Sequence, residues 1–300
     1  MRPSIVNRSL AVLFLFVLLG SAYFWGIRPT QLHWGATPEE WSRSMPEDQS
    51  VNEPAFDATR AITIGATPDQ IYPWLIQMGY GRAGFYGYDL IENLGSGSGI
   101  RSAETIVPAL QNPKPGDELP LSIAASLVYG PIKRNQFVIW KSADDPCSGV
   151  FIWELVPVDA NHTRLISRIR WNYVKSPSGL ILGVFTEFAD HVAVRKILEG
   201  VRDRAEGRQP ESLTREGVEI AAWCVAVLDF VICLLYIAFW RKWAWAWAMA
   251  MAAGFLLEFV LYDSSPLALR VALPCIYLIV IIVVWVKFGR FQNAVEYIPR

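Results

Sequence analysis

The hydrophobic positions of this chain gather into one run near the N-terminus and three runs near the C-terminus, with a more polar stretch between them. The four runs cover residues 9–27, 220–240, 243–262 and 267–286. An apolar helix needs about 20 residues to cross the hydrocarbon core of a bilayer. The pattern therefore predicts about four transmembrane helices, one before and three after a polar domain.

The polar stretch opens with the pattern of a strand and two short helices. Residues 59–64 alternate apolar and β-branched positions, which predicts a half-buried strand. Thr67, Pro68 and Asp69 then form a typical helix start, and apolar residues follow at helical spacing. Glycines around Arg82 end this helix, and a second short helix is expected after residue 86.

The rest of the polar stretch predicts antiparallel strands and one long helix. Modest strand patterns cover residues 102–107 and 118–123, and clearer ones cover 136–142, 150–158 and 163–173. The last strand places aromatic and aliphatic residues on one face and Arg164, Arg168 and Arg170 on the other. Residues 185–206 carry the apolar stripe of a helix, which would cover the sheet and give an α+β sandwich.

Composition narrows the possible functions. A net charge of -1 without a basic stripe gives no support for nucleic-acid binding. The four cysteines form no CxxC pair and the three histidines are scattered, so no metal site and no cofactor is expected. The glycine–serine run at residues 95–99 lacks the spacing of a phosphate-binding loop and is interpreted as a turn.

Flanking charges and aromatic residues predict the orientation in the membrane. Tyr23, Phe24 and Trp25 stand where a signal peptide would need small residues, so the first run is interpreted as an uncleaved anchor. Lys and Arg in the loop at 241–242 and after residue 286 favour the cytoplasmic side. The polar domain would then be extracytoplasmic in a bacterial cytoplasmic membrane, although Arg28 and the arginines before the second run oppose this orientation.

Residues 73–94, PWLIQMGYGRAGFYGYDLIENL, resemble the corresponding region of bacterial SRPBCC-superfamily members. Residues 102–121 and the strand pair at 151–171 are also similar to that branch. The superfamily has the helix-grip fold of START lipid-transfer domains and polyketide cyclases. The resemblance covers about half of the chain. It implies a curved antiparallel sheet around a long C-terminal helix, with two short helices after the first strand.

This resemblance sets the expected domain boundaries. Residues 1–28 would be an N-terminal transmembrane anchor and 29–54 a linker, either a tether or an arm lying on the domain. Residues 55–207 would be the helix-grip domain, followed by a second linker at 208–218. A three-helix transmembrane region at 219–287 and a tail at 288–300 would complete the chain.

The resemblance also implies a cavity between the sheet and the long helix. The residues expected to bind a ligand there are Trp74, Gln77, Met78, Tyr86, Tyr88, Trp140, Trp153, Trp171, Phe188 and Val192. An apolar cavity with few polar groups suits a lipid or another hydrophobic small molecule. The alternative is that the same residues only fill the core.

A polyketide cyclase or dehydratase-like enzyme would need an acid or base and polar groups in that cavity. The candidates are Arg82, Asp89 and Glu92, with Asp190 and His191 as a further pair. The interpretation favoured here is structural, with Arg82 pairing with Asp89 or Glu92 to hold the glycine-rich loop. His191 is expected on the solvent side of the long helix.

Two carboxylates fall inside the predicted spans, Asp229 in the second and Glu258 in the third. Intramembrane carboxylates are costly and often functional. Arg270 begins the fourth span and is expected to pair with Glu258. Asp229 has no partner predicted at its depth.

Three functions are compatible with these patterns. The leading hypothesis is a membrane-anchored domain that binds a lipid or another hydrophobic small molecule without transforming it. The alternatives are a polyketide cyclase/dehydratase-like enzyme acting on a hydrophobic substrate, and a membrane scaffold or sensor with an empty domain. The sequence does not identify a protein partner.

Overall fold

A computed structural model describes residues 5–142, 149–173, 176–239, 243–262 and 266–296. The chain forms two compact units. One, the sheet unit, is Pro29–Glu216, and the other, the helical unit, combines Met1–Arg28 with Gly217–Arg300.

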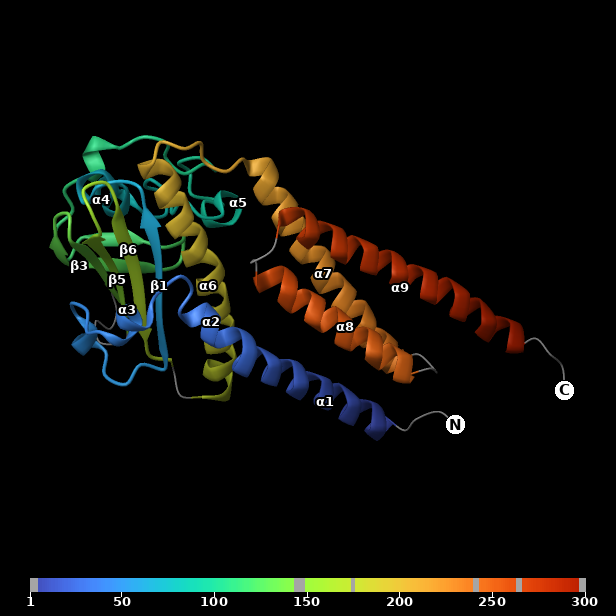
Figure 1. Ribbon diagram of the computed structural model, residues 1–300. Coiled ribbons are helices and arrows are strands. Elements are labelled where there is room, and N and C mark those ends of the chain that lie inside the picture. The colour runs from blue at the N-terminus through green and yellow to red at the C-terminus, as the bar shows by residue number, and fades with distance from the viewer. Residues whose placement is uncertain (1–4, 143–148, 174–175, 240–242, 263–265, 297–300) are drawn as a thin grey trace. The chain divides into compact units, whose positions relative to one another are not determined.

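Six antiparallel strands form the sheet of the sheet unit, in the order β1-β6-β5-β4-β3-β2 (Figure 1). The strands are β1 (Phe56–Ile64), β2 (Glu118–Pro120), β3 (Ser126–Lys133), β4 (Phe137–Ser142), β5 (Gly149–Pro157) and β6 (Thr163–Trp171). Helices α4 (Pro68–Gln77) and α5 (Asp89–Glu92) follow β1, and the 29-residue helix α6 (Pro177–Ala205) follows β6. α6 lies along one face of the sheet (Figure 1). This is the helix-grip fold, so the predicted fold class is confirmed.

Local sequence explains where the helices begin and end. A capping box between Thr67 and Gln70, with Pro68 in the first turn, starts α4. Gly79, at φ +140°, ends it because only glycine adopts that conformation without strain. Ser176 starts α6 by accepting a hydrogen bond from the N–H of Gly179, 3.0 Å away.

One predicted strand is absent from the described residues, and one strand that forms was not predicted. Residues 102–107 form a loop, followed by a 3₁₀ turn at Pro108–Leu110. β3 was not predicted, because Gly130 and Pro131 interrupt its pattern, and the pairing of β3 with β4 shifts register between Tyr129 and Ile132.

The two faces of the sheet bury different clusters. The inner face, which meets α4 and α6, carries the main core, including Trp140, Trp153 and Leu165. The outer face carries a smaller cluster around Ile139, Ile152 and Ile166. Alternate residues of each strand therefore serve opposite layers.

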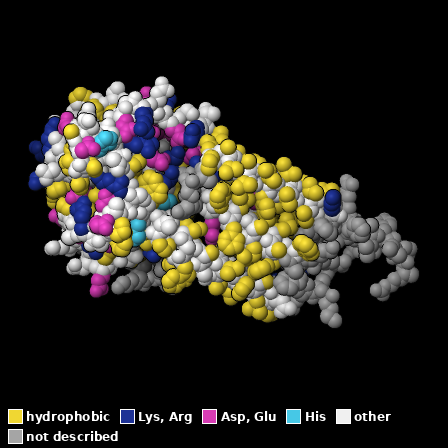
Figure 2. Space-filling model, viewed as in Figure 1, with side chains coloured by type: hydrophobic (Ala, Val, Ile, Leu, Met, Phe, Trp, Pro, Cys, Tyr) yellow, Lys and Arg dark blue, Asp and Glu magenta, His cyan; other side chains and the backbone are white. Residues whose placement is uncertain are grey.

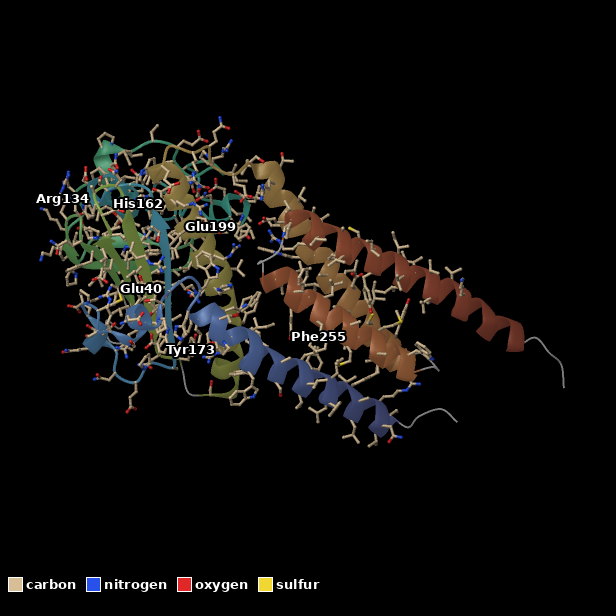
Figure 3. All side chains as sticks on the ribbon, in the orientation of Figure 1. Glu40, Arg134, His162, Tyr173, Glu199 and Phe255 are labelled. Carbon is tan, nitrogen blue, oxygen red and sulfur yellow. The ribbon has the colours of Figure 1, made fainter. Side chains whose placement is uncertain are left out.

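An acidic segment, residues 29–54, covers the outer face and is called the arm. It contains α2 (Arg28–Leu32, apart from its first residue), α3 (Pro38–Ser42) and a 3₁₀ turn (Asp48–Ser50). Arg164 Nε donates to Glu40 Oε1 over 2.6 Å, and Arg168 Nη1 donates to Asp48 Oδ2 over 2.6 Å. Figure 3 labels Glu40 among the strands it covers. The basic outer face is thus neutralised by the chain itself.

The arm also bonds to the main chain of β1. The Ala61 N–H donates to the Trp34 carbonyl over 3.1 Å. A Cβ on Gly35, which has φ +69°, would lie 2.2 Å from the Ala61 carbonyl oxygen. Glycine is therefore required where the arm approaches the strand.

The helical unit contains α1 (Ile5–Ala22), a π-helical turn (Tyr23–Ile27), α8 (Trp243–Tyr262), α9 (Leu267–Glu296) and α7 (Leu213–Phe239) from Gly217 onward. Within the described residues, three helical stretches are long and apolar enough to cross a membrane: Ile5–Leu32, Leu213–Ala238 and Leu267–Lys287. The apolar part of α8, Trp245–Leu261, is shorter. Hydrophobic side chains cover much of the visible face of these helices (Figure 2).

The predicted Glu258–Arg270 pair was wrong. Arg270 Nη2 donates to Glu219 Oε1 over 3.0 Å, and both residues are buried. Glu219 lies 51 positions before Arg270, on a different helix, and depth in the membrane alone could not identify it as the partner. Asp229 is fully buried, and neither of its oxygens has a hydrogen-bond partner among the described residues.

Candidate functional site

The loop between α4 and α5 closes one end of the grip and is held by Arg82. Its Nε donates to the Met78 carbonyl over 3.1 Å, and its Nη2 donates to the Tyr129 hydroxyl over 3.1 Å. The guanidinium also lies 5.6 Å from the centre of the Tyr129 ring. Arg82 was predicted to hold this loop by pairing with Asp89 or Glu92. It does bond across the loop, but the predicted partners were wrong, because its hydrogen bonds go to main-chain carbonyls and to a tyrosine.

Asp89 is fully occupied by neighbouring donors. Ser102 donates to it twice, from Oγ over 2.5 Å and from the main-chain N–H over 3.0 Å. Asn93 Nδ2 adds a third bond over 3.1 Å. Gly84 makes room for this arrangement, since a Cβ there would lie 2.1 Å from the Ser102 hydroxyl. Asp89 is thus a structural acceptor that orders the loop.

Glu92 is the titratable group of this end of the grip. Burial raises the pKa of its carboxyl to about 7. The hydrogen bond that Oε2 accepts from the Gly87 N–H over 3.1 Å lowers the pKa, but its effect is smaller. Oε1 is buried without a hydrogen-bond partner in the described part of the chain. Asp89 and Glu92 are therefore close together on α5, whereas Arg82 is bound elsewhere.

A second polar group lies where α4 meets this loop. Gln77 Nε2 donates to the Tyr86 hydroxyl over 3.0 Å, and that hydroxyl donates to the Trp74 carbonyl over 3.1 Å. The Val107 N–H donates to Gln77 Oε1 over 2.9 Å. Burial raises the pKa of Tyr86 well above its usual value. These bonds fix the predicted residues Trp74, Gln77 and Tyr86 as one unit, with Met78 and Tyr88 buried beside them.

Aromatic rings line the inner face of the sheet. The Trp140 and Trp153 ring centres are 5.2 Å apart, and Phe151 links Trp140 to Trp171 at centre distances of 6.2 and 6.3 Å. The Nε1 atoms of Trp140 and Trp153 are buried and have no acceptor within the described residues. Two hydrogen-bond donors thus lie unused in an apolar interior, which is uncommon because each costs free energy.

The ten predicted ligand-binding residues differ in exposure. Trp171 and Phe188 are half-buried, and the others are buried. Five of the ten, Trp74, Met78, Tyr86, Trp140 and Trp153, belong to the main core cluster. The structure therefore brings the helix-end residues and the sheet residues together in one packed interior, with Trp171 and Phe188 at its partly open margin.

A buried charge cluster under α6 was missed by the sequence analysis. Arg60, on the inner face of β1, donates from Nη1 to Asp190 Oδ2 over 2.5 Å and from Nε to the Gln31 carbonyl over 2.8 Å. His191 is only 1% exposed, so its predicted position on the solvent side was wrong. The available signal was an arginine on the apolar face of a predicted strand.

His191 should make the protein sensitive to acid. Burial and the charges of Arg60 and Arg195 lower its pKa from 6.5 to about 3, so the unfolded chain binds a proton that the folded chain does not between these values. From pH 7.5 to pH 5 this group removes about 2 kcal/mol of stability. His191→Met should not lose this stability. We therefore expect the difference in unfolding free energy between His191→Met and the wild type to be about 2 kcal/mol more favourable to the variant at pH 5 than at pH 7.5, measured by denaturant unfolding of the full chain in detergent.

His162 provides the control for this measurement. It lies in the exposed turn between β5 and β6 and is labelled in Figure 3. Its Nδ1 lies 2.9 Å from Asp159 Oδ1. His162→Gln should follow the wild type at both pH values. Equal behaviour of the two variants would contradict the assignment to His191.

Comparisons with known proteins give no family assignment by sequence. No family model matches the chain, and no curated protein matches it. Among solved structures, protein MLL2253 from Mesorhizobium loti matches with 13% identity and a TM-score of 0.33, covering 51% of this chain and 99% of that one. A Polyketide_cyc-like protein, Cgl2372 from Corynebacterium glutamicum, matches with 12% identity and a TM-score of 0.31, covering 50% and 91%. The Aha1 dimer from Colwellia psychrerythraea matches with 13% identity and a TM-score of 0.28, covering 51% and 97%.

Proposed function

We propose that the sheet unit binds a lipid or another hydrophobic small molecule between α6 and the inner face of the sheet. The observation that carries this proposal is the pair of indole N–H groups on Trp140 and Trp153, which are buried and have no acceptor in the described part of the chain. A ligand oxygen placed between them would satisfy donors that the protein leaves unused.

The surroundings define the chemistry of the ligand. Apart from the two N–H groups, the neighbourhood of Trp140 is aromatic, with Phe85 and Phe151 each within 6.4 Å between ring centres. Such a surface favours an apolar body, and the indole groups favour one carbonyl, ether or hydroxyl oxygen. The half-buried Trp171 and Phe188 would form the margin through which the ligand enters.

The membrane setting supplies such ligands. Apolar helices precede and follow the sheet unit in the chain, so the binding domain would be a membrane-anchored member of the SRPBCC superfamily. Charges in the short loops favour an extracytoplasmic sheet unit in a bacterial cytoplasmic membrane. Ligands dissolved in the bilayer would then be at high local concentration.

Binding without catalysis agrees best with the side chains at the closed end. Asp89 accepts three hydrogen bonds from Ser102 and Asn93, and Arg82 is bound to main-chain carbonyls and Tyr129. Neither is placed as a free acid, base or oxyanion donor. Glu92, with a pKa of about 7 and an Oε1 that has no partner among the described residues, is the candidate left for a cyclase or dehydratase-like enzyme.

The two indole groups can be tested by Trp140→Phe with Trp153→Phe. These changes keep the aromatic packing and remove both N–H donors. We expect the full-length double variant to retain its co-purified hydrophobic ligand about tenfold less well, since 1.4 kcal/mol corresponds to a factor of ten. Mass spectrometry of extracts from equal amounts of folded protein measures the ratio.

Trp41→Phe is the matched control, because Trp41 is 42% exposed on the arm and should not affect retention. Equal ligand content in the wild type and the double variant would contradict the proposed site. A wild-type protein that carries no hydrophobic molecule would instead support the sensor or scaffold alternative.

A further inference from the structure

A polar pocket of about 480 Å³ lies at the C-terminal end of α6, within the sheet unit. Its walls come from the Tyr86–Gly87 segment, the last turns of α6 and the linker that leads into α7. Figure 3 labels Glu199, one of the α6 residues of this wall. The pocket is separate from the aromatic interior, with which it shares only Tyr86 among the predicted ligand residues.

Arg204 is the central observation in this pocket. It is only 9% exposed, and its guanidinium lies 4.3 Å from the centre of the Tyr86 ring. It donates to the carbonyls of Ala103 and Gly200, over 2.8 and 3.2 Å. No carboxylate among the described residues forms a salt bridge with it. A buried cation without a counter-ion is costly, and an anion in the pocket would offset that cost.

The rest of the wall already holds an anion between two cations. The Glu211 carboxylate accepts a hydrogen bond from Lys196 Nζ over 2.5 Å and lies 2.5 Å from Arg215 Nε. Lys196 is itself 8% exposed and lies over the Tyr88 ring. The pocket is lined by four basic side chains and five carboxylates: Lys196, Arg202, Arg204, Arg215, Asp89, Glu199, Asp203, Glu211 and Glu216. Glu199, Asp203 and Glu211 already form ion pairs with arginine or lysine side chains. Among the described residues, Arg204 is the basic side chain of this wall without a salt bridge, and a group with several acceptor oxygens would suit it.

The position along the chain indicates the source of that group. Arg215 and Glu216 belong to the first turn of α7, and the stretch Leu213–Ala238 is long and apolar enough to span a membrane. The pocket wall is therefore continuous with the polar end of a candidate span. Phosphate groups of phospholipids lie at that level of a bilayer.

We infer that this pocket binds the phosphate of an anionic phospholipid headgroup, with Arg204 as the main ion partner and Lys196 and Arg215 beside it. The site is distinct from the apolar interior and does not depend on the function proposed for it. The phosphate would compete with Glu211 for Lys196 and Arg215, and would form with Arg204 the salt bridge that none of the described carboxylates forms.

The test is lipid binding to the full-length protein in detergent, followed by native mass spectrometry. The probes are phosphatidylglycerol, diacylglycerol and inorganic phosphate. We expect phosphatidylglycerol to bind, and Arg204→Gln to weaken its binding at least tenfold without affecting any binding of diacylglycerol. Arg215→Gln, at a side chain that is 58% exposed, should weaken it several-fold and carries the test if Arg204→Gln does not fold.

Arg208→Gln is the matched control. It removes the same charge four residues from Arg204, at a side chain that is 57% exposed and does not line the pocket. Binding should stay within twofold of the wild type. An equal loss in Arg208→Gln, or none in Arg204→Gln and Arg215→Gln, would overturn the site. Binding of inorganic phosphate that depends on Arg204, without binding of phosphatidylglycerol, would overturn the lipid as its source.

Discussion

Replacing Asp190 by asparagine is expected to destabilise the sheet unit by about 3–5 kcal/mol, because it leaves the buried Arg60 guanidinium without its carboxylate. Arg60 is 1% exposed and the Asp190 side chain is 8% exposed, so solvent cannot replace the lost charge. Asparagine keeps the size of the side chain, and the effect therefore reports the charge. Denaturant unfolding of the full chain in detergent, followed through amide protection of β1 and β6, measures it.

A double replacement separates the charge from the packing. Arg60→Met with Asp190→Leu removes both charges and fills the space with apolar atoms. Such exchanges are often neutral or stabilising, so this variant should be clearly more stable than Asp190→Asn alone. Asp159→Asn, at an exposed carboxylate in the β5–β6 turn, is the control and should leave stability close to that of the wild type. If the double variant is as unstable as Asp190→Asn, the uncompensated charge is not the cause.

Replacing Glu92 by glutamine is expected to stabilise the folded chain above pH 7 and to change little below pH 4.5. Burial raises the pKa of Glu92 from 4.5 to about 7, so the folded chain holds a proton in this interval that the unfolded chain has released. The corresponding stability is complete below pH 4.5 and is lost as pH rises through 7. At pH 8 the ionised carboxylate costs roughly 3 kcal/mol, which glutamine would remove.

Unfolding curves of wild type and Glu92→Gln at pH 5 and pH 8 test this expectation. Glutamine can still accept the hydrogen bond from the Gly87 N–H, so the local geometry is preserved. Glu104→Gln, at a side chain that is 55% exposed, serves as the control and should show no such difference. A Glu92→Gln variant that is less stable than the wild type at pH 8 would contradict the buried, proton-holding carboxyl.

Glu92 and His191 act in opposite directions over the same range of pH. Between pH 4.5 and 6.5 the folded chain binds one extra proton at Glu92 and lacks one at His191. Their contributions to the slope of stability with pH cancel there. These two groups together should therefore leave the unfolding free energy of the wild type independent of pH in this range. A variant that lacks one of them should show the pH dependence caused by the other.

Apart from β3 and the loop at residues 102–107, the sequence was sufficient for the order of elements. It was also sufficient for the two faces of β5 and β6, because these depend on local periodicity. It was insufficient for charged partners. Arg60 and Asp190 are separated by 130 positions, and their contact depends on how α6 crosses β1. Arg82 was assigned a carboxylate partner, but a main-chain carbonyl is an acceptor that every residue carries and no pattern reveals.

The candidate site shows the same division. The family resemblance placed Trp140 and Trp153 between the sheet and the long helix, and both belong to the main core cluster on the inner face. It could not show that their N–H groups lack acceptors, because that depends on the residues that surround them in three dimensions. The pocket around Arg204 was also out of reach, since its walls combine residues 86–89 with residues 196–216, which are more than 100 positions apart in sequence.

The arm has a consequence for solubility. β1 and β2 are the two edges of the sheet, and an open edge can pair with the edge of another molecule. β2 is protected by being three residues long and ending at Pro120. β1 has nine residues, and the bond from Ala61 to Trp34 places the arm along it. A fragment that began at residue 55 would therefore present a long bare edge together with unpaired arginines, and would be prone to self-association.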